Sequence, residues 1–399
     1  MRILFISGSV GLGHVTRDLA IAAELRRQEP TADIVWLAAS PASEVLDRAG
    51  ETLLPEAQYY ANDSAAIEHA AAGSGVNLIR YLMRARGAWA RNVEIFKQVL
   101  RKQHFDAVVA DEAYEVGLAV RKSPGLFPRP FVMIYDFVGL DSATGSPIEK
   151  LGVWLWNWKW SRGYGRPTPP NRLRLFIGEP EDVPDTHFGF LLPNRRAFVL
   201  AAYQFIGYVL PFDPAAYADH EAVRRRLGYG DEPLVVCSIG GTAIGKELLE
   251  LCGRALPIAR RKIARLRMIL VCGPRLSPES LNVPHDVEVR GHVGALYEHF
   301  AASDLAVVQG GGTTTLELTA LRRPFLYFPL EGHCEQEIQV AGRLARHQAG
   351  VKMILSHTTP ESLAKAIAAH LGTEPSYSPI PVHGAERAAE LICQMLRPL

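Results

Sequence analysis

The sequence predicts an α/β protein that consists of two doubly wound domains, each built on a parallel sheet. Short apolar runs that favour strands alternate with longer segments of helical periodicity, which is typical of parallel sheets covered by helices. The alternation starts twice, near residue 3 and again near residue 234, each time with a strand that runs into glycines. The length of 399 residues fits this division, because single domains usually contain about 100–200 residues.

In the N-terminal half, several short apolar runs have the composition of strands that are buried on both faces of a sheet. A glycine turn follows the first of them and leads into a helix at residues 16–28. The expected strands are residues 3–7, 33–38, 107–110 and 131–135.

The C-terminal half repeats this pattern. Its first strand also ends in a glycine turn, and helices are expected at residues 245–261 and 314–321. The expected strands are residues 234–239, 267–272, 287–289, 305–309 and 324–328.

These elements divide the chain into an N-terminal domain at residues 1–207, a proline-containing linker at 208–217 and a C-terminal domain at 218–385. The last segment, residues 386–399, is expected to be a helix that packs back on the N-terminal domain. Ligands of doubly wound sheets bind beyond the carboxyl ends of the strands. We therefore expect a cleft between the two domains, faced by both sets of strand ends.

The composition is ordinary for a globular protein and argues against several classes of function. The chain is 48% hydrophobic and 21% charged, and its formal net charge of +1 points to neither nucleic acid nor an acidic partner. Its five cysteines form no Cys-x-x-Cys pair, so we expect free thiols and no metal site. The first apolar run is too short for a signal peptide, and the longest, residues 197–210, is shorter than the roughly 20 residues that span a bilayer. A cytoplasmic location is expected.

The first glycine turn, residues 8–14, ends in Gly13 and His14 at the start of a helix. Its glycine spacing differs from the dinucleotide-binding order G-x-G-x-x-G. A neutral imidazole at this place can act as a general base, or it can simply bond to the helix backbone. Asp111 follows an expected strand, where its carboxylate would either orient His14 or cap the next helix, and Glu112 is a neighbouring candidate.

The second glycine turn, residues 240–247, nearly matches the phosphate loop G-x-x-x-x-G-K-[ST]. Glu247 stands where a serine or threonine would hold magnesium, which disfavours an enzyme that hydrolyses nucleoside triphosphates. The milder interpretation is a turn at Gly241 and Thr242 whose backbone N–H groups approach a phosphate.

The third glycine turn lies between an expected strand and the helix at residues 314–321, and it is the strongest candidate for an anion site. Three glycines allow a ligand to approach the backbone closely, and the N-terminal end of the helix favours a diphosphate. Glu317, one turn into the helix, could accept hydrogen bonds from two ribose hydroxyls. The alternative is a plain tight turn with a threonine cap. The turn consists of Gln309, Gly310, Gly311, Gly312, Thr313 and Thr314.

In this order, these residues resemble the GT-B UDP-glycosyltransferases, a superfamily that includes natural-product enzymes and the N-acetylglucosaminyltransferase that forms lipid II. Residues 309–317 are similar to its signature H-x-G-x-x-S-x-x-E. On this match Gly311, Thr314 and Glu317 fall on the glycine, the hydroxyl and the ribose-binding acid. Gln309 takes the place of a histidine that contacts phosphate. The resemblance implies the GT-B fold, in which two Rossmann-like doubly wound domains face a cleft.

The resemblance assigns roles to both domains. The N-terminal domain would bind the acceptor, with Gly13 and His14 similar to the glycine-histidine pair of the family and Asp111 matching its orienting acid. The C-terminal domain would bind the nucleotide sugar. Glu335 and Gln336 fall on the pair of residues that holds the sugar hydroxyls in the family. His292 takes the place of an aromatic residue that stacks on the base, and the backbone of Val293 would form a hydrogen bond to uracil.

The mechanism that the resemblance implies is inverting transfer from a UDP-sugar, which is a substrate, with no cofactor. His14 would take the proton of the acceptor hydroxyl, Asp111 would steady the imidazolium, and amides near residues 311–314, with Thr242, would stabilise the diphosphate. A helix end in this role removes the need for a metal, and the sequence has no Asp-x-Asp motif. Retaining relatives often carry two glutamates eight positions apart in this region, whereas here a glutamate is followed at that spacing by Gln339.

Two features point to a small apolar or lipid-linked acceptor and leave open peripheral contact with the inner face of a membrane. Residues 80–102 carry seven lysines and arginines, one glutamate and interleaved apolar side chains, which fits either an anionic lipid surface or a solvated helix. Residues 154–160 contain four tryptophans. They would line an acceptor pocket, lie at a lipid interface or pack in a core, and Trp154 and Trp156 are the acceptor-binding candidates.

Two other functions stay open. A UDP-sugar 2-epimerase shares the GT-B plan and would use the same diphosphate turn. A non-catalytic nucleotide-sugar-binding protein would need only the donor site. The joint presence of His14, Asp111, Glu335 and Gln336 favours an enzyme.

Overall fold

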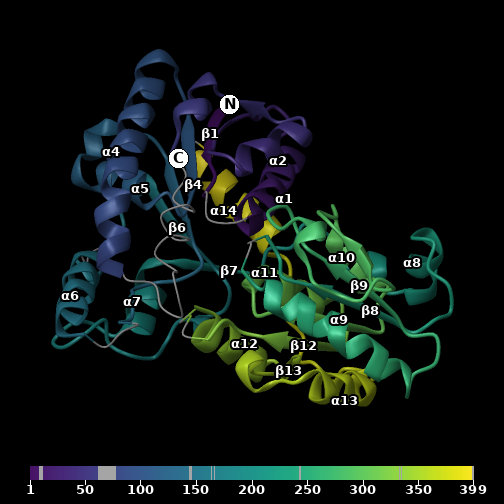
Figure 1. Cartoon of the computed structure of the whole chain (residues 1–399). Helices are drawn as coiled ribbons and strands as arrows, with labels where there is room; N and C mark the ends of the chain where they lie inside the picture. The colour runs from purple at the N-terminus through teal and green to yellow at the C-terminus, as the bar shows by residue number, and fades with distance from the viewer. Residues whose placement is uncertain are drawn as a thin grey trace. The chain divides into compact units, whose positions relative to one another are not determined.

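The computed structural model contains two compact units (Figure 1). The first consists of Met1–Pro211 and Pro381–Leu399, and the second of Phe212–Ile380. The first division falls inside the stretch predicted to be the linker, residues 208–217, and the second falls shortly before residue 385. The residues that the structure describes are 1–8, 12–61, 78–142, 146–162, 164–165, 167–241, 244–331, 333 and 335–397.

The described part of the first unit forms a parallel seven-stranded sheet in the order β3-β2-β1-β4-β5-β6-β7. This order extends outward in both directions from β1 and β4, as it does in doubly wound sheets. The strands are β1 (Arg2–Ile6), β2 (Asp33–Leu37), β3 (Thr52–Leu53), β4 (Ala107–Asp111), β5 (Phe131–Tyr135), β6 (Arg172–Ile177) and β7 (Gln204–Gly207).

Helices cover both faces of this sheet, and the side chains of β1 alternate between the two faces. Ile3 and Phe5 belong to one buried cluster with the helices α1, α2 and α14, whereas Leu4 and Ile6 belong to a second cluster with α4 and α5. The α-helices of this unit, within the part that the structure describes, are α1 (Leu12–Gln28), α2 (Ala42–Arg48), α4 (Leu78–Lys102), α5 (Tyr114–Lys122), α6 (Pro147–Ser161), α7 (Arg195–Ala202) and α14 (Gly384–Leu396).

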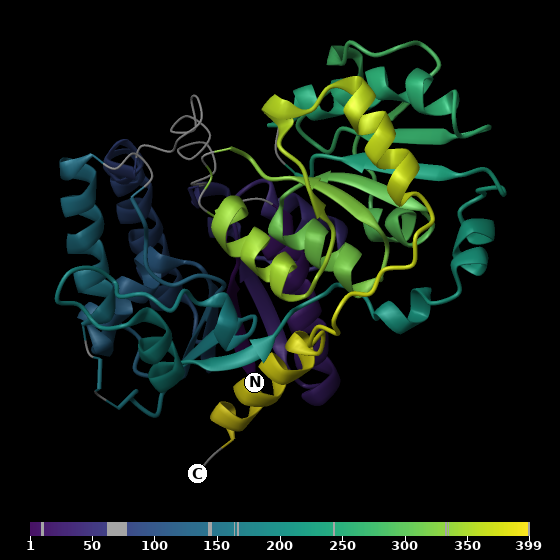
Figure 2. The ribbon, with the colours of Figure 1, turned by 90° about the horizontal axis from the view of Figure 1, so that it is seen from below.

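The last helix, α14, lies beside the first helix, α1 (Figures 1 and 2). Ile392 and Cys393 of α14 are buried in the same cluster as Ile21 and Leu25 of α1. The chain therefore returns to its first unit after completing the second.

The described part of the second unit forms a parallel six-stranded sheet in the order β10-β9-β8-β11-β12-β13. One buried cluster packs α9 and α13 against this sheet, and another packs α8, α10, α11 and α12 (Figure 2). The strands are β8 (Leu234–Ser238), β9 (Arg267–Val271), β10 (Glu288–Arg290), β11 (Leu305–Gln309), β12 (Phe325–Phe328) and β13 (Val351–Lys352). The helices are α8 (His220–Arg226), α9 (Lys246–Arg260), α10 (Leu296–Ala301), α11 (Gly312–Ala320), α12 (Ala341–Arg346) and α13 (Pro360–His370), and a π-helix covers Glu335–Val340.

The prediction of two doubly wound parallel sheets is confirmed, although some elements differ in extent. Helix α1 begins at Leu12 rather than at residue 16, and α11 begins at Gly312 rather than at residue 314. The apolar run at residues 197–210 divides between α7 and β7. Among the helices that the structure describes, none is both long enough and apolar enough to cross a bilayer.

Candidate functional site

In the first unit, the strand order reverses between β1 and β4, which is where doubly wound sheets bind ligands. The two strands run parallel, with Ile6 beside Ala110, so the turn after β1 lies next to the end of β4. A Cβ added to Gly8 would lie 3.1 Å from the carbonyl oxygen of Asp111 and 3.4 Å from the ring of His14. A larger residue would be crowded here, so the glycine at position 8 allows the close approach of His14 to the end of β4.

His14 and Asp111 meet at this point. The imidazole Nδ1 lies 3.0 Å from Asp111 Oδ2, and the side chains are 12% and 0% exposed. Asp111 is the last residue of β4, and α5 begins at Tyr114 with Ala113 at its N-cap. The helix-cap interpretation of Asp111 is thus excluded, and its carboxylate faces the imidazole.

Arg17 joins this pair, and the sequence analysis did not identify it. Its Nη2 donates to Asp111 Oδ1 at 2.7 Å, its Nε donates to Oδ2 at 3.0 Å, and its Nη1 donates to Asp136 Oδ2 at 2.7 Å. Nη2 also lies 2.7 Å from His14 Nδ1. The spacing of His14 and Arg17 in the sequence could have indicated this contact, because residues three apart on a helix are neighbours.

Glu112 and Asp136 form a pair of carboxyl groups on the other side of the imidazole. Glu112 has a left-handed backbone, with φ of 48°, and its Oε2 lies 3.6 Å from His14 Nε2. Burial and the neighbouring Asp136 raise the pKa of Glu112 well above its usual value. Burial opposes ionisation of Asp136, but Arg17 and a hydrogen bond from Glu112 lower its pKa well below the usual range. Glu112 therefore holds the proton of the pair and Asp136 the charge.

A second buried pair divides its charge in the same way. Burial alone would raise the pKa of Asp111, but Arg17 and His14 outweigh it and lower that pKa. Asp18 is fully buried and accepts a hydrogen bond from Ser7 Oγ at 2.5 Å, and burial and Asp111 raise its pKa well above the usual value. Asp111 is accordingly the ionised carboxylate that faces His14.

A metal ion is not expected from the sequence, and three side chains bear on that expectation. Ligand atoms of His14, Glu112 and Asp136 lie within 4.8 Å of one another among the described residues. Arg17 already donates to Asp136, and Glu112 is the protonated member of its pair. A divalent ion would have to displace the proton of Glu112 and compete with the guanidinium of Arg17 for Asp136.

In the second unit, the strand order reverses between β8 and β11, so the second and third glycine turns follow neighbouring strands. Gly241 is partly exposed in the turn after β8, whereas Thr242 falls outside the described residues. Lys246, which takes the place of the phosphate-loop lysine, lies 3.6 Å from Glu250 on the surface of α9. This ion pair on the helix gives no support to a nucleoside triphosphatase.

The three glycines after β11 differ in their surroundings. A Cβ added to Gly310 would lie 2.8 Å from the Cα of Pro329, so this position needs glycine for packing. Among the residues that the structure describes, none has an atom within 4 Å of a Cβ added to Gly311, and the first neighbours of one on Gly312 lie at 3.8 Å. Protein packing therefore leaves open space beside Gly311, at the start of α11.

Helix α11 begins without a capping side chain. Gly311 is its N-cap and Gly312 its first residue, and Thr313 and Thr314 follow in the first turn. The hydroxyl of Thr315 donates backward to the carbonyl of Gly311 at 2.9 Å rather than accepting from the helix. The threonine-cap alternative is thus excluded, and the first N–H groups of the helix are suited to an anion.

Gln309 is directed away from this helix end. Its side chain is buried, and with its amide in the orientation that satisfies its neighbours, its nitrogen donates to the carbonyls of Ile239 at 3.0 Å and Ile244 at 3.2 Å. Gln309 thus fastens the third glycine turn to the second. Its amide N–H groups are used within the protein, which leaves phosphate binding to other groups.

Glu317 lies on α11, one turn beyond the glycines, and its side chain is partly exposed. Burial raises the pKa of its carboxyl group to about 8. A carboxyl group accepts hydrogen bonds on both of its oxygens only when it is ionised, so the protonation of Glu317 bears directly on its predicted role.

Glu335 and Gln336 begin the π-helix that follows β12, and π-helical turns occur frequently at functional sites. The side chain of Glu335 reaches α11, because its Oε1 would lie 3.8 Å from a Cβ on Gly312. Gln336 accepts a hydrogen bond from the backbone N–H of Leu330 at 2.9 Å, which fixes its amide. The predicted sugar-binding pair thus lies in the same unit as the glycine turn, and Glu335 faces it.

The two residues predicted to bind the base follow β10. His292 is exposed, as a stacking side chain would need to be in the absence of a ligand, and Val293 packs against the apolar cluster beneath α10. Their roles stay predictions.

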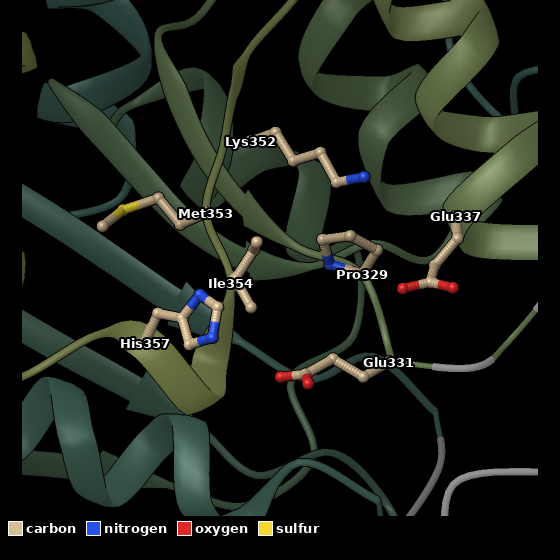
Figure 3. Close-up of a pocket in the computed structure, with 7 residues that line it drawn as sticks. All are labelled: Pro329, Glu331, Glu337, Lys352, Met353, Ile354 and His357. Atoms are coloured by element: carbon tan, nitrogen blue, oxygen red, sulfur yellow. The ribbon is translucent and has the colours of Figure 1, made fainter.

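A pocket of about 360 Å³ lies beyond the ends of β12 and β13 (Figure 3). It adjoins the π-helix and carries two carboxylates, an ammonium and an imidazole, all of which bond well to hydroxyls. Sequence reasoning missed it, because β13 is short and its residues are exposed. The lining residues are Pro329, Glu331, Glu337, Lys352, Met353, Ile354 and His357.

The tryptophans at residues 154–160 lie on α6 and are distributed around that helix. Trp154 stacks on Trp158 and donates from Nε1 to the carbonyl of Phe190 at 2.9 Å, whereas Trp156 packs against Trp89 of α4. Trp154 and Trp156 therefore face different neighbours. Acceptor binding by either one stays a prediction.

Comparison with known proteins bears on both units. The family described as glycosyltransferase family 28 C-terminal domain matches residues 235–388. An uncharacterized glycosyltransferase from Methanopyrus kandleri is 27% identical over 194 residues, which are 48% of this chain and 54% of that protein. The chain thus matches about half the length of this relative.

Two further proteins extend the comparison. UDP-N-acetylglucosamine–N-acetylmuramyl-(pentapeptide) pyrophosphoryl-undecaprenol N-acetylglucosamine transferase from Carboxydothermus hydrogenoformans is 26% identical over 116 residues, 28% of this chain and 31% of that protein. The crystal structure of the glycotransferase of kitacinnamycin superposes with a TM-score of 0.62 and 16% identity over 99% of both chains. This likeness shows the two-domain fold.

Proposed function

We propose that the chain is an inverting, metal-independent glycosyltransferase. Its GT-B fold and the match of residues 235–388 to the glycosyltransferase family 28 C-terminal domain support this proposal. It transfers a sugar from a UDP-sugar to the hydroxyl of an apolar or lipid-like acceptor. The observation that carries the proposal is the start of α11, where Gly311 borders open space and the first N–H groups of the helix lack a capping side chain.

In this proposal the second unit binds the donor. The N-terminal end of α11 attracts the diphosphate, Glu317 accepts hydrogen bonds from the ribose hydroxyls, and Glu335 and Gln336 bind the sugar. As the bond between the anomeric carbon and the phosphate oxygen breaks, negative charge grows on the leaving diphosphate. The helix end stabilises that charge without reorganisation, which is the electrostatic part of catalysis.

The first unit supplies the base. Because His14 Nδ1 faces Asp111, its Nε2 is the nitrogen that takes the acceptor proton. The acceptor oxygen then forms a bond to the anomeric carbon on the face opposite the diphosphate, and UDP leaves. Asp111 stabilises the imidazolium, and Arg17 fixes the orientation of Asp111.

An exposed apolar surface in the first unit supports a lipid-like acceptor and peripheral contact with a membrane. Leu151, Leu155 and Trp158 follow one side of α6, next to the turn that carries Phe190 and Leu191. The two turn residues are 81% and 86% exposed. Exposed cations lie on and just after the same helix, namely Lys150, Lys159 and Arg162, and would favour anionic lipid.

Acceptor-dependent release of UDP tests the reaction class. The chain is incubated with UDP-sugars in the presence of EDTA, with and without a polyprenyl-linked acceptor. Release of UDP that requires the acceptor, with inversion at the anomeric carbon by NMR, is expected. An altered sugar still attached to UDP would identify an epimerase instead, and loss of transfer in EDTA would contradict the metal-independent mechanism.

A further inference from the structure

The proposed donor site presents a problem of charge. A nucleoside diphosphate carries negative charge. The signature that this turn resembles begins with a histidine, but this chain has Gln309 at that position. The side-chain amide of Gln309 donates hydrogen bonds to the carbonyls of Ile239 and Ile244. Lys246 of the neighbouring turn is paired with Glu250 on α9. A cation from another element would therefore complete the site.

Arg343 of α12 lies at this place. Its Nη2 donates to the carbonyl of Gly312, the first residue of α11, at 2.9 Å. The same nitrogen would lie 3.8 Å from a Cβ on Gly312, as would Oε1 of Glu335. The guanidinium and a predicted sugar-binding carboxylate thus meet the first turn of α11 together.

The local structure explains how Arg343 reaches the turn. The π-helix at Glu335–Val340 leads directly into α12, and Val340 and Leu344 are buried in an apolar cluster of the second unit. Arg343 therefore extends from a helix that directly follows the predicted sugar-binding segment. A guanidinium is planar and carries five donors in a fork whose geometry suits phosphate oxygens.

We propose that Arg343 binds the diphosphate of the nucleotide sugar and supplies the positive charge that Gln309 lacks. This inference rests on the proposed function and names a residue of the same donor site. The helix N-terminus and Arg343 act on one anion, the first through backbone N–H groups and the second through a full charge. As the diphosphate leaves, the fixed guanidinium also offsets its growing charge.

Binding of UDP and of uridine to the variants R343Q and R343K tests this role. UDP is measured by calorimetry and the weaker uridine by ligand-observed NMR, on protein whose melting temperature is recorded. Hydrogen bonds to charged groups contribute about 1.5–3 kcal/mol, so R343Q should bind UDP about 10- to 150-fold more weakly. Its affinity for uridine should change by less than about threefold, because uridine has no phosphate. R343K should retain part of the affinity for UDP.

The matched control is R346Q, which removes an arginine from the same helix and should leave both affinities unchanged. An R343Q variant that binds UDP as the wild type does would overturn the inference. Equal losses for UDP and uridine would also overturn it, because they would show that Arg343 only supports the local fold. A wild-type chain that binds no nucleoside diphosphate would instead refute the proposed function, and the inference would fall with it.

Discussion

Arg17 and Asp111 form a two-pronged ion pair, in which Nε lies 3.0 Å from Oδ2 and Nη2 lies 2.7 Å from Oδ1. Both oxygens of Asp111 are thereby fixed, and Oδ2 also faces His14 Nδ1. The bond from Arg17 to Asp136 anchors the guanidinium at its other end. The candidate base thus belongs to a network of four side chains and does not depend on a single carboxylate.

Removing the base tests the proposed chemistry. H14A should lower kcat by at least about 10²-fold, since general-base catalysis contributes about 10²–10⁴-fold. Its affinity for the donor should stay unchanged, because the donor residues lie in the second unit. H104A, which alters an exposed histidine of the first unit, is the control and should keep full activity. Full transfer by H14A with normal donor binding would show that His14 is not the base.

Removing the charge of Asp111 tests the ion pair. D111N keeps the shape of the side chain but removes one of the two carboxylates that pair with Arg17, while Asp136 remains. The free energy of unfolding should therefore fall in urea titrations by more than about 1 kcal/mol and by at most about 3–5 kcal/mol. D33N removes an exposed partner of Arg2 and should cost less than about 1 kcal/mol.

The pH dependence of this loss has a definite sign. The pKa of Asp111 is lower in the folded protein than in the unfolded chain, so its stabilising contribution is complete above the unfolded value of about 3.9. It is lost as the pH falls through the lowered folded value. The difference between the wild type and D111N should therefore persist at neutral pH and shrink only in acid below about pH 4. A difference that is constant down to pH 2 would contradict the charged pair.

Donor affinity should depend on pH through Glu317. Its pKa is about 8, and only the ionised carboxylate accepts hydrogen bonds from both ribose hydroxyls. The affinity for a UDP-sugar, whose diphosphate does not titrate in this range, should therefore rise by up to roughly tenfold per pH unit below that value and level off above it. In E317Q the dependence should disappear, as it should for a 2′,3′-dideoxy-UDP-sugar with the wild type. A flat profile for the wild type would contradict the ribose-binding role.

The apolar surface on α6 should bind anionic lipid. Wild-type protein should sediment with phosphatidylglycerol vesicles at low salt, and L151E and F190E should reduce the bound fraction several-fold, because each places a negative charge on an exposed apolar site. I338E alters an exposed apolar residue of the second unit and is the control. No sedimentation of the wild type at low salt would refute contact with the membrane.

Much of the fold could be predicted because the central strands are continuous apolar runs between glycine turns, as β1, β8 and β11 are. Strand β6 was missed because Arg172 and Arg174 alternate with leucines at its start, where the strand is only partly buried. The secondary structure of the tryptophan-rich segment could not be predicted. Its tryptophans occur at every second position, which distributes the rings around a helix and leaves no apolar face of helical periodicity.

The site could be predicted where it depends on strand ends. His14 and Asp111 are 97 residues apart, yet both follow central strands and therefore meet. Arg17 could not be distinguished from a surface arginine of an amphipathic helix. The inward direction of Gln309 could not be read from its position in the signature, because it depends on backbone carbonyls of another turn.

The central claim is that the open space at the start of α11 holds the diphosphate of a nucleotide sugar. The variant G311V tests it most directly, because a Cβ added at Gly311 meets no atom of the described residues within 4 Å and the backbone there, with φ of −67°, suits valine. Calorimetric titration with a UDP-sugar should give at least tenfold weaker binding for G311V than for the wild type, at an unchanged melting temperature. Equal affinity of the two proteins would contradict the account.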